Sequence, residues 1–189
     1  MTRSLQRRPG ARKVRASLPL ASVPFWNHTH PVRWRDVGRL DCTIARTLSV
    51  IGDRWTLLIL RDAFLGIRRF EDFQRDLDVS RHRLADRLGK LVKHGVLRRE
   101  RYQMRPARWE YRLTDKGRDV YPVLAAMAAW GDRWLIGPEG TPLVLHHTAC
   151  DHDMHAVVVC SECDEPLDVR QVRAKAGPGY PTSDGPAPS

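Results

Sequence analysis

Two pairs of histidine and cysteine residues near the C-terminal end have the spacing of metal ligands. His147 and Cys150 form one pair, Cys160 and Cys163 form the other, and nine residues separate them. Imidazole nitrogens and thiolates are the usual ligands of tetrahedral Zn²⁺, and small zinc ribbons hold the metal between two such pairs. Residues 156–159, Ala-Val-Val-Val, would form a strand that leads into the second pair. We therefore predict a small zinc-ribbon-like appendage in which these four side chains bind Zn²⁺.

Other interpretations of this cluster stay open at this stage. His146, His152 and His155 are alternative fourth ligands. The segment could also be a reduced tail without metal, a protein-interaction module, or the dithiol of a thiol–disulfide enzyme. The enzyme alternative lacks the βαβ pattern that normally surrounds a redox Cys-x-x-Cys motif. The sequence also lacks the common phosphate-binding, hydrolase and metalloprotease motifs, so we expect a protein that is not an enzyme.

The fourth cysteine, Cys42, lies far from this cluster in the sequence. Its predicted position is the first residue of a helix, where the positive end of the helix dipole favours a thiolate. Such a thiol could sense oxidants or electrophiles. The favoured alternative is a small apolar residue packed in a dimer interface, because no second cysteine nearby could trap a sulfenic acid. A redox or small-molecule effector therefore stays a hypothesis.

Positive charge is concentrated on one predicted helix and on the hairpin that follows it. The apolar side of this helix consists of Leu84, Leu88, Leu91 and Val92. The residues expected to contact DNA lie elsewhere on the helix and in the hairpin loop, namely Ser80, Arg81, His82, Arg83, Arg87, Lys90, Lys93, Arg105 and Arg108. The first helical turn would enter the major groove, where arginine can pair with guanine. A cationic helix beside a cationic hairpin predicts a winged helix-turn-helix that binds double-stranded DNA.

Hydrophobic periodicity predicts the elements that position these residues. Apolar residues at helical spacing indicate helices over 42–51, 54–65, 69–77 and 81–94. Asp41, Asp53 and Ser80 are the expected N-caps of the first, second and fourth helices. Ile44, Leu48 and Ile51 would form the apolar face of the first helix.

Beyond the fourth helix the apolar period changes from 3.6 to 2 residues. Trp109, Tyr111 and Leu113 alternate with charged residues and predict a half-buried strand over 108–113, paired with 96–102. A last helix follows Thr114, with one apolar stripe of Val120, Leu124, Met127 and Trp134. Pro122 lies within this helix and should kink it or make its start ragged.

Composition divides the chain into a core domain and flanking segments. The net charge is +10, but the first 35 residues contribute +8 without any acidic residue, so the remaining 154 carry only +2. The location of the charge therefore supports a nucleic-acid partner more than the total does. No apolar run approaches the ~20 residues of a membrane helix, and we expect a cytoplasmic protein. The expected regions are a disordered basic extension (1–35), a DNA-binding and dimerisation domain (36–136), a linker (137–145), the Cys/His appendage (146–170) and a disordered tail (171–189).

Four stretches of the core resemble a known family. They are Asp41-Cys42 with the helix that follows, the segment 51–61 (IGDRWTLLILR), and the motifs 69–73 (RFEDF) and 111–117 (YRLTDKG). This combination is similar to the HxlR-type winged-helix transcriptional regulators over about residues 40–135. The resemblance implies a mainly α fold with a small antiparallel β-wing. It also implies a homodimer, built largely by the first and last helices, that represses or activates transcription at a palindromic operator. The turn at 77–80 departs from the family, which often has Gly and Ile there, and the resemblance does not cover the appendage.

Overall fold

The computed structural model describes residues 33–175 and 177–178. Most of the predicted basic extension and of the predicted C-terminal tail therefore lies outside the described residues. Within them, the first element is a 3₁₀-helix, η2 (Trp34–Arg39). The first helix of the described residues thus begins two residues before the predicted domain boundary at residue 36. None of the helices in the described part is long and apolar enough to cross a lipid bilayer.

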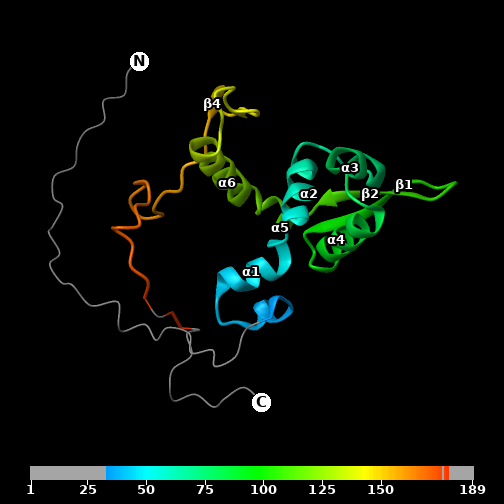
Figure 1. Ribbon diagram of the computed structural model, residues 1–189, viewed down its shortest axis with the longest axis horizontal. Coiled ribbons are helices and arrows are strands. Elements are labelled where there is room, and N and C mark those ends of the chain that lie inside the picture. Colours follow the sequence, from blue (N-terminus) through cyan, green and yellow to red (C-terminus); the bar gives the residue numbers. More distant parts are fainter. Residues whose placement is uncertain (1–32, 176, 179–189) are drawn as a thin grey trace, which may run out of the picture. The chain divides into compact units, whose positions relative to one another are not determined.

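Four α-helices follow, close to the predicted positions (Figure 1). They are α1 (Thr43–Ile51), α2 (Arg54–Phe64), α3 (Phe70–Leu77) and α4 (Arg81–Lys93). The helices α2, α3 and α4 pack together around Ile59, Leu60, Phe73 and the three leucines of α4, Leu84, Leu88 and Leu91, all of which are fully buried. The predicted apolar side of α4 is confirmed, and it fixes which face of this helix is turned outward.

Ion pairs add to the contacts between these helices. Asp62 of α2 is fully buried, and its Oδ1 lies 2.7 Å from Nη2 of Arg61. Burial raises the pKa of the Asp62 carboxyl, while the adjacent guanidinium acts in the opposite direction. The same Arg61 nitrogen lies 3.1 Å from Oδ2 of Asp76 in α3. Arg61 thus connects α2 to α3 and compensates part of the cost of a buried carboxylate.

The helix termini differ in part from the sequence-based prediction. Asp53 caps α2 as predicted, since its carboxylate accepts hydrogen bonds from the amides of Trp55 and Thr56. Asp41 does not cap α1, because Cys42 occupies the N-cap position and Asp41 binds Arg46 instead. Ser80 occupies the N-cap of α4, but its hydroxyl makes no capping hydrogen bond. Asp78 ends α3 with φ of +44°, a left-handed conformation that aspartate tolerates better than most residues.

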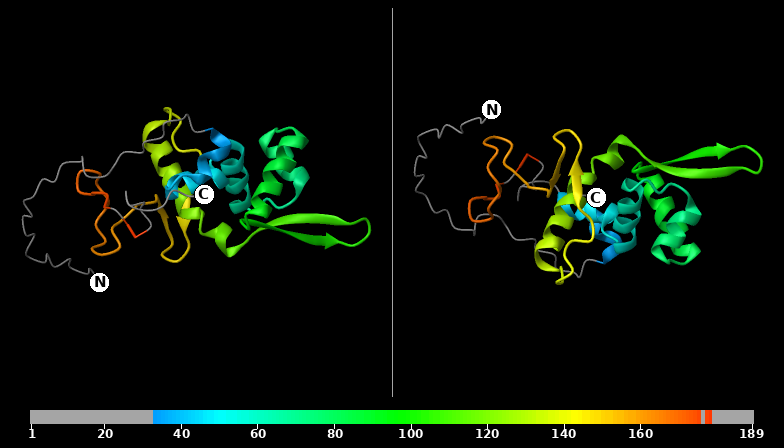
Figure 2. Two further views of the ribbon diagram at one scale, coloured as in Figure 1. Left: turned by 90° about the horizontal axis from the view of Figure 1, so that it is seen from below. Right: turned by 90° about the horizontal axis from the view of Figure 1, so that it is seen from above.

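The wing is an antiparallel hairpin of β1 (Leu97–Gln103) and β2 (Arg108–Leu113), which projects from the helices (Figure 2). Its register pairs Leu97 with Leu113 and Arg101 with Trp109. The α2–α3 connection adds a short third strand, because the Tyr111 amide donates to the Arg68 carbonyl at 2.8 Å and Arg69 bridges Glu110. The prediction that β2 is half-buried is confirmed only in part. Tyr111 and Leu113 pack on the core, whereas Trp109 is exposed.

Thr114 connects the wing to the end of α4. Its hydroxyl donates to the Gly95 carbonyl at 2.6 Å and accepts the Gly117 amide at 3.0 Å. A Cβ on Gly117 would lie 2.2 Å from the Val96 carbonyl oxygen. Only glycine therefore fits this close approach of two backbone segments.

The predicted last helix is two helices, α5 (Asp115–Arg118) and α6 (Tyr121–Trp134). The break lies at Asp119–Val120, and it places Pro122 in the first turn of α6, where a missing amide hydrogen costs nothing. The prediction of a ragged start is confirmed, but Pro122 is a first-turn proline after all. Of the predicted stripe, Val120 and Leu124 pack on the core, while Met127 and Trp134 are exposed.

The C-terminal part of the described chain contains a second hairpin, β3 (Leu145–His147) and β4 (His152–Met154). Residues of this hairpin and of the segment before it line a shallow apolar hollow together with Ala125 and Ala129 of α6. The segment before the hairpin is therefore not a free linker, because Leu143 and Leu145 lie beside α6. A second, mainly apolar hollow between α2 and α6 includes the same two leucines.

Candidate nucleic-acid interface

The exposed face of α4 carries the residues that we predicted to contact DNA. Arg81, His82, Arg83 and Lys93 are exposed, as is Ser80 just before the helix, and Lys90 is half-buried. The fully buried leucines of the opposite face hold this orientation. The Arg83 guanidinium lies over the Trp55 ring of α2, 5.8 Å from its centroid. Cations at the start of α4 therefore lie at the surface, and aromatic rings beneath them restrict their positions.

A hollow of about 590 Å³ separates the starts of α3 and α4 from the wing. Four arginines from three different segments line it, Arg69, Arg81, Arg99 and Arg108. Three of them lie over aromatic rings, Arg69 over Tyr102 (4.7 Å), Arg81 over Phe70 (4.9 Å) and Arg99 over Trp109 (4.6 Å). Stacking orders a guanidinium and leaves its N–H edge available, which is the geometry that phosphate recognition uses.

The predicted set of DNA contacts lacks Arg69 and Arg99, two of the four arginines of this hollow, and it also lacks Trp109. Arg69 is the N-cap of α3 and reaches the wing because the α2–α3 connection pairs with β2. No local sequence pattern predicts that contact. Trp109 was assigned to the core on its alternation with charged residues. Its ring instead lies between Arg99 and Arg101 on the exposed side of the hairpin.

Arg87 differs from the other cations of α4. Its Nε lies 2.9 Å from Oδ1 of Asp53, the N-cap of α2, and it also contacts Asp86. Asp53 is partly buried, which opposes its ionisation, but the hydrogen bond and charge of Arg87 outweigh burial and lower the pKa of its carboxyl. We correct the sequence-based assignment, because the charge of Arg87 is engaged in joining α4 to α2.

Some arginines of the wing form ion pairs, whereas others are exposed. Arg98 binds Glu100, and Arg112 binds both Glu110 (2.6 Å) and Glu100 (2.9 Å). The hydrogen bond from Arg98 lowers the pKa of the Glu100 carboxyl. Arg105 lies in the exposed loop and Arg108 at the exposed start of β2. The arginines near the wing tip, and not those near its base, are therefore the ones placed for an external partner.

At the C-terminal end of α4, three lysines lie close to His94. Burial and then the nearby charges of Lys90, Lys116 and Lys93 lower the pKa of His94. The Lys116 ammonium donates to the His94 carbonyl at 2.9 Å, at the C-terminal end of the helix where a cation is favourable.

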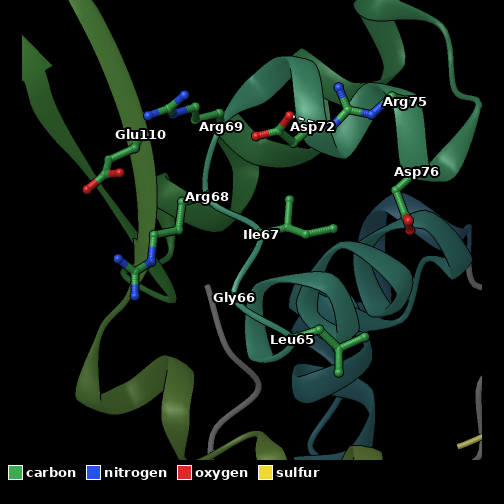
Figure 3. A pocket seen from close by; sticks show the side chains of 9 residues that line it. All are labelled: Leu65, Gly66, Ile67, Arg68, Arg69, Asp72, Arg75, Asp76 and Glu110. Atoms are coloured by element: carbon green, nitrogen blue, oxygen red, sulfur yellow. Dashed lines mark hydrogen bonds and ion pairs between the residues drawn. The ribbon is translucent and has the colours of Figure 1, made fainter.

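Figure 3 shows a second hollow, of about 470 Å³, on the side of the α2–α3 connection. Its walls carry Arg68, Arg69 and Arg75 together with Asp72, Asp76 and Glu110. The dashed line joins Arg75 to Asp72, an ion pair of 2.6 Å. Charges of both signs compensate each other here, so this hollow lacks the excess positive potential of the hollow between α4 and the wing.

The sequence-predicted cysteine sites lie apart from this surface. Cys42 is the half-buried N-cap of α1, one residue before the predicted helical position, and its sulfur makes no capping hydrogen bond. Nδ1 of His147 lies 3.2 Å from Sγ of Cys150, so the first predicted pair is formed. Cys160 and Cys163 lie in one turn, which the hydrogen bond from the Asp164 amide to the Cys160 carbonyl closes at 2.9 Å. The two pairs are separate, however, since the described residues hold no group of three or more potential metal ligands.

Comparison with known proteins agrees with this geometry. The model of the HxlR-like helix-turn-helix family matches residues 50–138. An HTH-type transcriptional regulator of Mycobacterium tuberculosis is 41% identical over 138 residues, which cover 73% of this chain and 87% of the relative. The chain belongs to the HxlR-like helix-turn-helix family. This family membership confirms the resemblance found in the sequence.

Solved structures show the same fold. The HxlR-like chain matches the crystal structure of PA1607, named as a candidate transcription factor, with a TM-score of 0.68 and 36% identity. The match covers 74% of this chain and 98% of PA1607. A second transcription-factor structure, PA1374 from Pseudomonas aeruginosa, gives a TM-score of 0.51, also at 36% identity, over 72% of this chain and 93% of its own. The protein is therefore a DNA-binding transcriptional regulator with a winged helix-turn-helix, as its sequence predicted.

Proposed function

We propose that this regulator binds a palindromic operator as a homodimer, with the start of α4 in the major groove and the wing on the adjacent phosphate backbone. The observation that carries the proposal is the hollow between α4 and the wing, lined by four arginines from three segments. A DNA strand placed there would meet guanidinium groups on both sides. Arg83 would contact base edges, and Arg105 would contact phosphates. Such a regulator acts where the DNA is, and we place it in the bacterial cytoplasm.

The apolar surface of α1 and α6 supports the dimer. Of the predicted apolar face of the first helix, Ile44 is 70% exposed and Leu48 is 38% exposed. On α6, Val123, Met127, Trp130 and Trp134 are also exposed. Isolated exposed apolar residues are normal, whereas a set of this size on two helices is typical of a surface that another protein covers. A second copy of the chain would bury it and would set the separation of the two α4 helices.

DNA binding and assembly can be measured together. We expect a dimer in sedimentation experiments and half-sites about 34–36 Å apart, one helical turn of DNA. The logarithm of the affinity should fall with the logarithm of salt concentration, with a slope near −0.9 for each phosphate neutralised. A stable monomer that binds DNA, or an affinity independent of salt, would contradict the proposal.

The alternative of a thiol–disulfide enzyme has one favourable observation, the single backbone turn that carries both Cys160 and Cys163. Turnover of a small disulfide substrate by the purified protein tests it directly. We expect none, because family membership and the arginine-lined hollow both support a regulator. Cys42 is a candidate sensor, and the test is whether oxidation of Cys42 changes operator affinity.

A further inference from the structure

The two Cys/His pairs of the C-terminal part are built on the same backbone turn. In the first turn the amide of Asp151 donates to the carbonyl of His147 at 2.9 Å, and Asp151 has φ of +57°. In the second turn the amide of Asp164 donates to the carbonyl of Cys160 at 2.9 Å, and Asp164 has φ of +58°. Each turn thus begins and ends with a metal-binding residue type, followed by an aspartate in the left-handed region. The sequence has the same pattern in both turns, and the structure adds that both aspartates share one backbone conformation.

Both turns lie at the end of paired strands. His147 pairs with His152 across β3 and β4. The second turn is closed by the bridge between Val159 and Pro166 and by the hydrogen bond from the Leu167 amide to the Val158 carbonyl, 3.0 Å. Two short hairpins, each with a ligand pair in its turn, are the two halves of a zinc ribbon.

Within the first half, the ligand atoms are close to the geometry that zinc requires. Zn–N and Zn–S bonds at a tetrahedral angle separate the nitrogen and sulfur by about 3.6 Å. The observed distance from His147 Nδ1 to Cys150 Sγ is 3.2 Å, so a movement of only about 0.4 Å would let both bind one ion. In the second half, the amide of Cys160 donates to the carbonyl of Glu165 at 2.9 Å, which closes the turn that holds both cysteines.

The segment between the halves has the length and composition to bring them together. After Cys150 the chain runs along β4 for three residues, His152–Met154, and continues through residues 155–158, which belong to no strand in the structure, to Cys160. Residues 152–154 and 157–159 are equally long and two residues apart, so pairing them would place Cys160 beside the first turn. The three valines are about half exposed, although β-branched residues favour strands, and in the described part β4 pairs with β3 alone.

We propose that His147, Cys150, Cys160 and Cys163 bind one Zn²⁺ ion, and that residues 157–159 then pair with the free edge of β4 as a third strand. The three cysteines bind as thiolates and release their protons, and His147 binds as neutral imidazole. Zinc would supply the cohesion that so few residues cannot obtain from an apolar core. The metal is structural, because four protein ligands leave no position for a substrate.

Metal content of the purified full-length protein tests the site. We expect about one zinc ion per chain after gel filtration with a weak competing chelator, the stoichiometry of a four-ligand site. Cys160→Ser with Cys163→Ser should lose the metal, and so should His147→Ala. The matched controls are Cys42→Ser and His155→Ala, a cysteine and a histidine outside the proposed set, which should keep it. Equal zinc in the wild type and in the double serine variant would overturn the site, as would a wild type without zinc.

Two further measurements test the zinc ligands and the third strand. Reconstitution with Co²⁺ should give the visible absorption of a tetrahedral site and a thiolate charge-transfer band, and Cys150→Ser should reduce that band by about a third, since three thiolates contribute. Hydrogen exchange should show that zinc protects the amides of residues 157–159. A Co²⁺ spectrum of octahedral type, or unchanged exchange in this segment, would contradict the proposal. Neither reading depends on DNA binding, so the site can fail while the proposed regulator function stands.

Discussion

The helix-turn-helix and its wing differ from α1 and α6 in how completely each buries its apolar side chains. In α2, α3 and α4 the large residues Ile59, Leu60, Phe73 and Leu88 are fully buried, and cations occupy the outer face. In α1 and α6 the exposed residues include Ile44, Trp130 and Trp134. The first region buries its apolar side chains within a single chain and exposes charged residues, whereas the second exposes apolar side chains. The two surfaces suit two different partners, DNA and a second copy of the chain.

The largest effect should come from the buried region. Leu88→Ala removes a fully buried side chain and should lower the free energy of unfolding by about 2–5 kcal/mol, because the lost burial and the resulting cavity add. The matched change on α1 is Ile44→Ala. Urea unfolding at several protein concentrations separates the two. The loss in Leu88→Ala should be independent of concentration, whereas any loss in Ile44→Ala should grow as the protein associates. The same behaviour in both variants would contradict the distinction.

The second effect concerns association. Trp130→Ala on α6 should weaken the dimer by about 2 kcal/mol, a roughly 30-fold higher dissociation constant, since buried tryptophans often dominate interfaces. Its control is Trp109→Ala, another exposed tryptophan, which lies on the wing. Analytical ultracentrifugation should show a changed dimer only for Trp130→Ala. If both tryptophans affect the dimer equally, α6 is not the specific interface.

The third effect concerns DNA contacts. Arg83→Ala should cost about 1–3 kcal/mol of operator affinity and change the ranking of operator variants, if Arg83 pairs with a guanine. Arg105→Ala should weaken all sequences alike and reduce the salt slope by about 0.9, the contribution of one phosphate. Fluorescence anisotropy with a panel of operator variants measures both. An unchanged ranking in Arg83→Ala would show that this residue does not read the sequence.

The smallest effect concerns the contact between Asp53 and Arg87. Asparagine also caps helices, so Asp53→Asn tests mainly the ion pair, and we expect a loss of about 1 kcal/mol at neutral pH. Because folding lowers the pKa of the Asp53 carboxyl, its stabilisation is fully present above the unfolded value near 3.9 and disappears as the pH falls below it. The difference between wild type and variant should therefore shrink below about pH 4. An equal difference at about pH 3 and at neutral pH would contradict the ion pair.

Local sequence patterns were sufficient for the helix-turn-helix and the wing. Apolar spacing located α2, α3 and α4, and the change of period located β1 and β2, because these elements bury one face in the same chain. Apolar spacing also located α1 and most of α6. It does not tell whether the surface that covers an apolar stripe belongs to the same chain or to another, and the role of these helices in a dimer was implied by the family resemblance alone.

The remaining errors share a different cause. The partner of Arg87 is Asp53, 34 residues earlier, and the contact of Arg69 with the wing also joins distant segments. Side-chain type and local spacing cannot reveal such pairings. The segments 147–151 and 160–164 share a spacing that the sequence shows, but only the structure shows that both place an aspartate in the left-handed region.

The hydrogen bond between the Arg68 carbonyl and the Tyr111 amide has a consequence for how this regulator can diverge. It fixes the wing to the α2–α3 connection through main-chain atoms, which every residue except proline supplies in full. Substitutions at the exposed positions of the hairpin can therefore accumulate without displacing it. Descendants of this chain could acquire new operator preferences by exchanging the side chains of the wing, while the frame that presents them to DNA is inherited unchanged.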